Sequence, residues 1–239
     1  MTFTGIFDLT SDLQMNTAIV VAAGSGNRFD PNTPKQFVEI LGKPLIIHTL
    51  ENFEACESVS QVILVLPQDE IADFKDLIAK FGLKKISSVV AGGASRAESV
   101  LKGLNAVDPA TDVVAVHDGV RPLVSTDEIA AVIEKAKEMG AACLVAVVTD
   151  TIKQVKDGRI TGTVDRKNLR RAMTPQAFRY SILKQALEFA DLSSSVTDEC
   201  MLVERQGHEI AYVEGSLRNI KVTHPEDRVL AEALLRHMQ

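Results

Sequence analysis

The chain has little cysteine and no long uninterrupted apolar segment. Its three cysteines, Cys56, Cys143 and Cys200, are odd in number and show no C-x-x-C spacing. This pattern predicts buried, reduced thiols of a cytosolic protein, and it argues against disulfides and a zinc site. No apolar stretch approaches the length of a membrane span. The sequence therefore predicts neither a disulfide-stabilised secreted domain nor a protein embedded in a membrane.

The chain also lacks an excess of positive charge. Its 26 basic residues are outnumbered by 32 acidic ones, which gives a net charge of −6. A field of this sign does not favour nucleic acid or an anionic membrane surface as a partner. An anionic substrate would have to be held by cations that cluster locally.

The first residues match no targeting signal. They lack the basic start and long apolar region of a signal peptide, and they carry Asp8 and Asp12 but no arginine, unlike a plastid transit peptide. With Met15 as an alternative start, residues 1–15 are expected to be a disordered leader or a cloning extension. Residues 16–239 are long enough for one large α/β domain, and we expect a cytoplasmic location.

Strand-like and helix-like segments alternate along the first two thirds of the chain. The strands are continuous apolar runs rather than alternating ones, which is typical of a mostly parallel sheet covered by helices on both faces. The sequence therefore predicts a Rossmann-like α/β fold. The expected strands are residues 18–23, 59–66, 86–91, 113–116 and 141–148, and the expected helices are residues 44–55, 69–80, 95–106 and a segment that Ser125 and Glu128 cap and Gly140 ends.

This alternation breaks between residues 149 and 174. The segment is polar and β-branched, and Asp157-Gly158 is a hairpin turn signal. It has too few apolar residues to pack on the main core, so we expect a projecting β-arm that contacts another molecule. Beyond it the chain returns to helices, including residues 223–238, for which Thr223 and Glu226 are the expected capping box.

The most informative segment is residues 18–36, AIVVAAGSGNRFDPNTPKQ. A buried strand leads into Gly24 and Gly26, and Arg28 and Lys35 follow. Glycines let backbone N–H groups approach phosphates, and the cations neutralise their charge. The segment does not fit a Walker loop, and Phe29 stands where a dinucleotide fingerprint requires its third glycine. It favours nucleotide binding over an ordinary turn with two solvated cations.

Further polar clusters stand where strands are expected to end, which is where open α/β sheets bind ligands. Gly92-Gly93, with Arg96 and Ser99, fits either a phosphate or base site or a helix-entry turn. In the segment of residues 117–122, HDGVRP, Asp118 and Arg121 fit either a ribose or phosphate site or a structural ion pair. Thr174 and Thr197 lie in short segments that taken alone indicate caps and turns, and Lys221 taken alone indicates a solvated strand lysine.

Together these clusters resemble one family, the bacterial and plastid 2-C-methyl-D-erythritol 4-phosphate cytidylyltransferases of non-mevalonate isoprenoid synthesis. The resemblance runs from about residue 16 to the C-terminus. Its motifs are AAGSGNRF with PKQF, GGASRAESV, HDGVRP, DTIK, VDR, TPQAF, TDE, and NIKVT with PED. The clearest departure is Gly119-Val120, where the family commonly has two alanines. Ribitol-5-phosphate cytidylyltransferases share the fold and the opening motifs and are the near alternative.

The resemblance implies a role for each motif residue. The CTP site would comprise Ala22, Ala23, Gly24, Gly26, Gly93, Ser99, Asp118 and Gly119. Arg28 and Lys35 would grip the triphosphate and stabilise the transition state, with Arg166 and Lys221 as further catalytic cations. Arg121, Thr151, Thr174 and Thr197 would bind the sugar phosphate. In the family the arm joins a homodimer, so Thr151 and Arg166 would serve the neighbour's site.

The implied chemistry also fits the residues. A phosphate monoester, with a second pKa of about 6, is largely dianionic at neutral pH and can attack the α-phosphorus of CTP without a general base. The remaining obstacle is repulsion between polyanions, which cations and Mg²⁺ relieve. The five histidines show no metal-ligand spacing, so Mg²⁺ is expected to be held mainly by the phosphates of CTP. The rival hypotheses are a non-catalytic nucleotide-binding protein of the same fold and, less well supported, a nicotinamide-dependent dehydrogenase.

Overall fold

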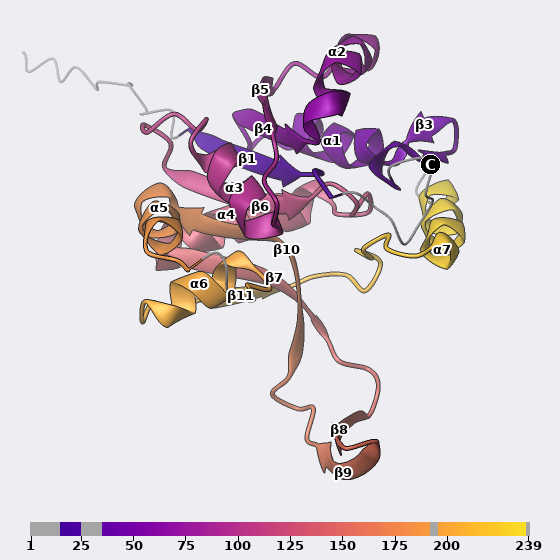
Figure 1. Cartoon of the computed structure of the whole chain (residues 1–239), viewed down its shortest axis with the longest axis vertical. Helices are drawn as coiled ribbons and strands as arrows, with labels where there is room; N and C mark the ends of the chain where they lie inside the picture. Colours follow the sequence, from indigo (N-terminus) through magenta and orange to yellow (C-terminus); the bar gives the residue numbers. More distant parts are fainter. Residues whose placement is uncertain (1–14, 25–34, 192–195, 238–239) are drawn as a thin grey trace, which may run out of the picture.

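The computed structural model describes residues 15–24, 35–191 and 196–237 of the chain. Its centre is a seven-stranded sheet in the order β11-β7-β10-β6-β1-β4-β5 (Figure 1). All adjacent pairs are parallel except the two that β10 makes, which confirms the predicted, mostly parallel sheet. The strands are β1 (Asn16–Val21), β4 (Gln61–Leu66), β5 (Ile86–Ala91), β6 (Val113–Asp118), β7 (Ala141–Val147), β10 (Arg170–Arg179) and β11 (Ala211–Glu214).

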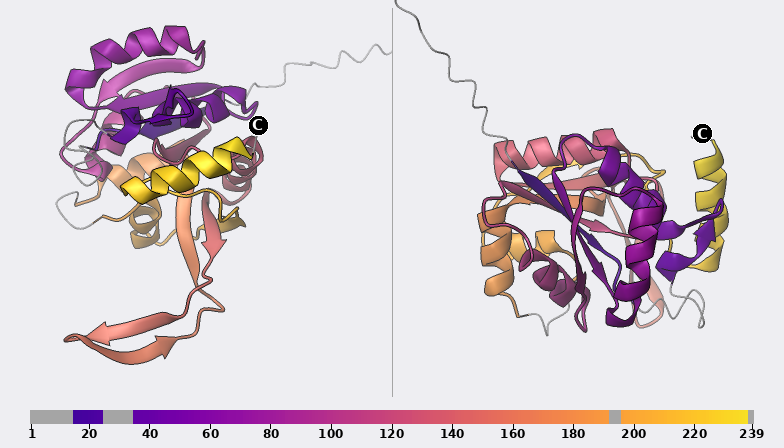
Figure 2. Two further views of the ribbon diagram at one scale, coloured as in Figure 1. Left: turned by 90° about the vertical axis from the view of Figure 1, so that its right-hand side faces the viewer. Right: turned by 90° about the horizontal axis from the view of Figure 1, so that it is seen from above.

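Helices cover both faces of this sheet, as the view from above in Figure 2 shows. One hydrophobic core includes Ala18 and Val20 of β1, and the other includes the intervening Ile19. Alternate residues of one strand thus enter opposite cores, which explains why the strand sequences are apolar throughout. The first core receives α1 (Leu45–Ala55), α2 (Ile71–Lys80) and α4 (Thr126–Met139), and the second receives α3 (Arg96–Leu104), α5 (Tyr180–Glu188) and α6 (Glu199–Arg205).

The predicted ends of α4 are confirmed. The Glu128 N–H donates to Ser125 Oγ at 3.1 Å, and the Ser125 N–H donates to Glu128 Oε2 at 2.9 Å. At the other end Gly140 has φ of 89°, a left-handed conformation that glycine adopts without steric cost. Local side-chain chemistry alone determines both ends of this helix.

The three cysteines are buried and free, as predicted. Within the described part of the chain, no helix is long and apolar enough to cross a membrane.

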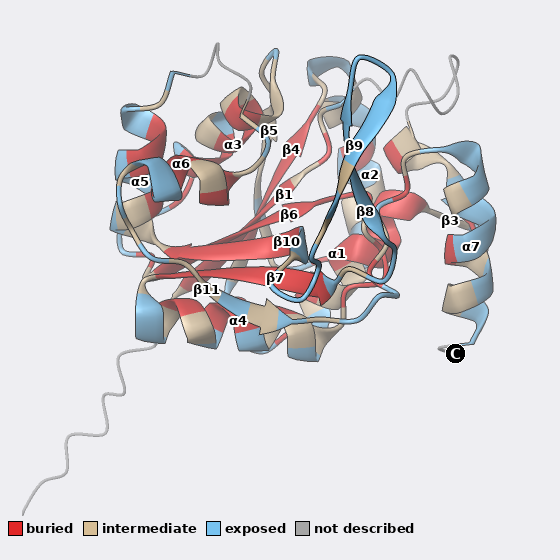
Figure 3. Cartoon of the chain, turned by 90° about the horizontal axis from the view of Figure 1, so that it is seen from below, coloured by how far each residue is buried: buried red, intermediate tan, exposed pale blue. Residues whose placement is uncertain are grey.

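The segment expected as an arm, residues 149–174, forms a projecting hairpin and the first part of a strand of the main sheet. A hairpin of β8 (Ile152–Lys156) and β9 (Arg159–Val164) projects from the sheet with Asp157-Gly158 at its turn (Figure 1). Residues 170–174, however, belong to β10, where residues 170–172 pair with β7 in the main sheet. The expectation that the arm extends to residue 174 was therefore wrong, because Met173 and Thr174 are buried. Figure 3 shows the contrast between the exposed hairpin and the buried sheet.

Two expectations for the C-terminal part were also wrong. The capping contacts of α7 (Pro225–Arg236) start one residue later than expected, because the N–H groups of Thr223 and His224 both donate to Asp227 Oδ2 at 2.8 Å. Pro225 occupies the first turn of this helix. Lys221 lies in an irregular segment and not in a strand. This segment and α7 pack beside the short strands β2 (Glu39–Ile40) and β3 (Lys43–Pro44) in a third apolar cluster.

Candidate functional site

A cavity of about 440 Å³ opens at the carboxyl edge of the parallel strands. Its wall begins with Ala22, Ala23 and Gly24, which directly follow β1, and continues with residues that follow β5 and β6. Parallel strands end at one edge of a sheet, so residues distant in sequence meet there. The remaining described residues of the lining are Val21, Lys35, Gln36, Gly93, Ala94, Ser95, Arg96, Ser99, Asp118, Val120 and Lys221.

The loop after β5 needs its first glycine because another loop packs directly against it. A Cβ added to Gly92 would lie 2.2 Å from the Cβ of Ala23, closer than real side chains approach. The loop is also held from within, since the Gly93 N–H donates to Ser99 Oγ at 3.0 Å and Ser99 Oγ donates to the Ser95 carbonyl at 2.9 Å. The GGASRAES motif therefore builds a rigid wall of the cavity.

A second cavity of about 260 Å³ adjoins the first. The two share Arg96, Asp118 and Lys221 in their linings. The second cavity adds residues from β10, which runs antiparallel to both of its neighbours, and from the segment before α6. Its other lining residues are Arg121, Ala172, Met173, Thr174, Gln176, Thr197 and Asp198.

The shared residues form a charge cluster around the buried carboxylate of Asp118. Arg96 Nε donates to Asp118 Oδ1 at 2.9 Å. Lys221 Nζ lies 2.9 Å from Asp118 Oδ2, and Arg121 Nε lies 3.4 Å from the same oxygen. Burial alone would raise the pKa of Asp118, but Arg96, Lys221 and Arg121 outweigh it and hold that pKa well below its usual range. Asp118 is therefore ionised, and it forms ion pairs with three cations at the junction of the cavities.

A second carboxylate completes the cluster. Arg96 Nη1 donates to Glu199 Oε1 at 2.6 Å, and Glu199 is fully buried at the start of α6. Burial raises the pKa of Glu199, an effect that Arg96 opposes. Three cations thus face two carboxylates, so the cluster has a net positive charge before Lys35 is counted. Such a junction attracts anionic groups from both sides.

The segment that carries Lys221 is tied to the same cluster. Arg121 Nη1 donates to the Asn219 carbonyl at 2.9 Å, and Asn219 Nδ2 donates to the Thr174 carbonyl at 3.0 Å. These bonds hold an irregular segment without any sheet ladder. Lys221 itself keeps 39% of its side chain exposed, so it can reach a ligand.

The structure brings most of the predicted site residues together. Eleven of them line one or both cavities within a single chain. Gly119 packs against Ala22, a lining residue of the first cavity. A Cβ added to Gly119 would lie 2.9 Å from the Cβ of Ala22. Gly26 and Arg28 lie outside the described residues. The first cavity is lined by Ala22, Ala23, Gly24, Lys35, Gly93, Ser99, Asp118 and Lys221, and the second by Asp118, Lys221, Arg121, Thr174 and Thr197.

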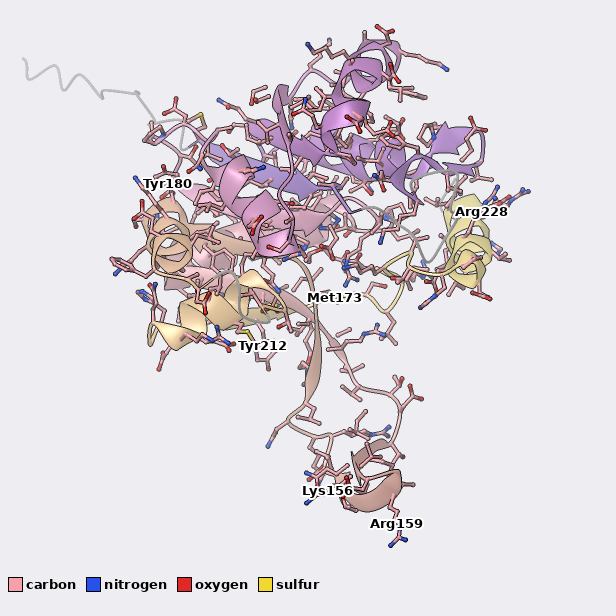
Figure 4. All side chains as sticks on the ribbon, in the orientation of Figure 1. Lys156, Arg159, Met173, Tyr180, Tyr212 and Arg228 are labelled. Atoms are coloured by element: carbon pink, nitrogen blue, oxygen red, sulfur yellow. The ribbon has the colours of Figure 1, made fainter. Side chains whose placement is uncertain are left out.

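Two predicted residues do not reach either cavity of their own chain. Thr151 and Arg166 are exposed on the arm, and the Arg166 guanidinium contacts the Thr149 carbonyl at the arm's base. Figure 4 labels Lys156 and Arg159 at the far end of the arm, well away from Met173 in the wall of the second cavity.

Sequence reasoning missed the roles of Arg96 and Glu199. Arg96 is the first residue of α3, where a cation opposes the helix dipole and needs carboxylate partners. An arginine at the start of a predicted helix can be recognised in the sequence, so this residue could have been found. Glu199, in contrast, follows the N-cap Asp198 and looks like an ordinary acidic first-turn residue. Only the tertiary structure shows that it is buried.

The described residues contain no group of three or more His, Cys, Asp or Glu side chains placed to hold a metal ion. Both oxygens of Asp118 are already paired with cations. Among the described residues, the site supplies cations and backbone groups.

Comparison with known proteins gives consistent matches. Residues 16–237 match the family model described as 2-C-methyl-D-erythritol 4-phosphate cytidylyltransferase. The chain is 42% identical to the protein of that name from Geobacter metallireducens, over 92% of this chain and 97% of the other. It is also 42% identical to a bifunctional enzyme IspD/IspF from Desulfotalea psychrophila, over 94% of this chain but only 58% of that protein.

The fold has close counterparts among solved structures. The 4-diphosphocytidyl-2C-methyl-D-erythritol synthase from Anaerococcus prevotii superposes with a TM-score of 0.82 at 30% identity. The match covers 94% of this chain and 97% of the other.

The charge cluster predicts a specific stability change for Asp118→Asn. Removing this carboxylate leaves the largely buried Arg121 without a carboxylate partner and Arg96 with Glu199 alone, which costs about 3 kcal/mol of unfolding free energy near pH 7. Because the folded pKa of Asp118 is lowered, its contribution is complete above the unfolded value of about 4 and is lost as pH falls below it. The wild type should therefore lose more stability than the variant on acidification.

Urea unfolding near neutral pH and near pH 3 measures both effects. Asp76→Asn, at an exposed position of α2, is the matched control and should leave stability nearly unchanged. Equal stability of Asp118→Asn and Asp76→Asn near neutral pH would contradict the assigned charge cluster.

Proposed function

The chain belongs to the 2-C-methyl-D-erythritol 4-phosphate cytidylyltransferase family, and we propose that its two adjoining cavities hold CTP and methylerythritol phosphate side by side. The resemblance drawn from the motifs is thereby confirmed. The chain is a nucleotidyltransferase that transfers CMP from CTP to 2-C-methyl-D-erythritol 4-phosphate and releases pyrophosphate. One observation carries the arrangement: the cavities share Arg96, Asp118 and Lys221.

The larger cavity suits the nucleotide. Its wall of small residues permits close approach of a base and a phosphate chain to the backbone. Lys35 lines the same cavity, and with Arg28 it would neutralise the triphosphate and the charge that grows on the leaving pyrophosphate. Neither role needs a proton donor or acceptor.

The smaller cavity suits the sugar phosphate. Lys221 and Arg121 are the cations there that would hold its phosphate, and Thr174 and Thr197 offer hydroxyl groups. Because Lys221 lines both cavities, it would draw the attacking phosphate oxygen toward the α-phosphorus of CTP. Positioning and charge neutralisation then replace general base catalysis, since the attacking phosphate is already ionised at neutral pH.

Mg²⁺ would bind through the phosphate oxygens of CTP. This ion takes oxygen ligands and usually binds substrate phosphates with only one or two protein carboxylates. When bound, it supplies further neutralisation of the polyphosphate charge. The protein's own part is the cation cluster, which would orient the metal–nucleotide complex.

The arm would complete the site of a second copy of the chain. Its side chains Val155 and Ile160 are 71% and 68% exposed, although both are apolar. An isolated two-stranded hairpin is marginally stable in water, so it needs a surface to pack on. A two-fold dimer would cover these side chains and deliver Thr151 and Arg166 to the partner's second cavity.

The assay that tests this function measures pyrophosphate release with CTP, Mg²⁺ and either methylerythritol phosphate or ribitol 5-phosphate. We expect release with methylerythritol phosphate and much slower release with ribitol phosphate. Faster turnover of ribitol phosphate would assign the chain to the related reaction. Binding of CTP without release from either substrate would favour the non-catalytic alternative.

Lys221→Met tests the place of this lysine between the cavities. Methionine keeps much of the side-chain length but has no charge. Turnover with methylerythritol phosphate should fall by about 10²–10³, as for loss of one preorganised charge contact, while CTP affinity measured by calorimetry changes little. Arg218→Met, at an exposed position in the same segment, is the control. Collapse of CTP affinity in Lys221→Met would place this lysine in the nucleotide subsite instead.

Mixed dimers test the role of the arm. Lys35→Ala damages the body of a subunit and Arg166→Ala damages only its arm, so each variant alone should be nearly inactive. Random mixing makes half of the dimers mixed, and one of their two sites then combines an intact body with an intact arm. Co-expression with two different affinity tags should restore about a quarter of wild-type activity.

Co-expression of two differently tagged copies of Lys35→Ala is the control and should restore nothing. If the verified mixture of Lys35→Ala and Arg166→Ala also stays inactive, the arm acts within its own chain.

A further inference from the structure

His117 stands directly behind the second cavity and has no part in the function proposed above. It is fully buried near the end of β6, next to Asp118. Its ring makes two polar contacts, to the Arg121 carbonyl oxygen at 3.3 Å from Nε2 and to Thr174 Oγ1 at 3.1 Å from Nδ1. The ring also packs 5.0 Å from that of Phe53, between centroids, so its orientation is held.

The two contacts determine which ring nitrogen carries the proton. A carbonyl oxygen only accepts hydrogen bonds, so Nε2 must be the protonated nitrogen that donates to Arg121. Burial lowers the pKa of His117 to about 3, which Asp118 only partly opposes, so the ring is neutral at physiological pH. Nδ1 therefore has no proton and can only accept.

This arrangement determines what Thr174 can do. Its hydroxyl has one hydrogen and two acceptor lone pairs. The hydrogen is donated to His117 Nδ1, and one lone pair accepts the Asp118 N–H at 3.1 Å. Thr174 is only 4% exposed, and it lines the second cavity. A ligand that reaches this hydroxyl would meet one free lone pair and no hydrogen left to donate.

We propose that His117 is a positioning residue that fixes Thr174 as a hydrogen-bond acceptor, so that Thr174 binds a hydroxyl group of the polyol and not its phosphate. An ionised phosphate presents only acceptor oxygens and would be repelled by this lone pair. The phosphate is then left to the cations Lys221 and Arg121 in the same cavity. The inference rests on the proposed function. It places a polyol hydroxyl of the substrate at Thr174 and the phosphate at Lys221 and Arg121.

The kinetic experiment compares His117→Asn with His117→Gln. Asparagine places an amide oxygen near the position of Nδ1 and can still accept from Thr174, whereas glutamine places its amide near Nε2. We expect KM for methylerythritol phosphate to rise about 2- to 10-fold in His117→Gln, the worth of one neutral hydrogen bond. His117→Asn should keep KM near the wild-type value, and both variants should keep their affinity for CTP. An equal rise of KM in the two variants would overturn the proposal.

Substrate analogues that each lack one hydroxyl identify the partner of Thr174. The wild type should be less active on the analogue that lacks the hydroxyl bound by Thr174 than on the full substrate. On that one analogue, Thr174→Val should be as active as the wild type. Thr174→Ser, which keeps the hydroxyl, should behave as the wild type. If Thr174→Val instead weakens every analogue equally, the side chain contacts the common phosphate and the proposal fails.

Nitrogen-15 NMR of histidine-labelled wild-type protein tests the tautomer without any substitution or substrate. We expect one fully buried histidine, identified as His117 by its absence in His117→Asn, to be neutral with its proton on Nε2. A proton on Nδ1, or a charged ring near neutral pH, would overturn the inference. Absence of pyrophosphate release from wild-type protein would count against the proposed function alone, since the NMR result does not depend on turnover.

Discussion

Asp118 is a buried carboxylate surrounded by three cations, and the site is organised around this contact. An ionised carboxylate buried without partners would be strongly unfavourable. Arg96 from α3, Arg121 from the loop after β6 and Lys221 from the irregular segment before α7 satisfy it. Each cation belongs to a different part of the chain, so the carboxylate also determines how those parts are arranged. The cations outnumber the carboxylates in this cluster, which leaves positive charge at the junction of the two cavities.

The sheet explains why the charge cluster lies between two cavities. The parallel strands β1, β5 and β6 end at one edge, and the small residues that follow β1 and β5 leave room for the first cavity. The antiparallel β10 reaches the same edge from the other direction and supplies Thr174 to the second cavity. A wholly parallel sheet would not bring a mid-strand threonine beside Asp118.

The cluster also explains how phosphate chemistry can proceed here without a general base. A phosphate monoester is already largely ionised at neutral pH, and the carboxylates of the cluster, Asp118 and Glu199, are paired with cations. Repulsion between the substrates is the main barrier, and preorganised cations lower it. Buried neutral groups such as His117 and Thr174 would contribute in another way, because their fixed hydrogen-bond directions would distinguish a hydroxyl from a phosphate.

The sequence by itself determined most of the elements and pointed to many of the residues that line the two cavities. Continuous apolar strands, the Ser125–Glu128 cap and Gly140 depend on local chemistry, so their positions were predictable. The motifs after the strands were also predictable as neighbours, because parallel strands share an edge. Only the tertiary structure decided the direction of β10, the burial of Glu199 and the pairing of Asp118 with Lys221. These depend on contacts between residues far apart in the chain, and neither local propensity nor periodicity contains that information.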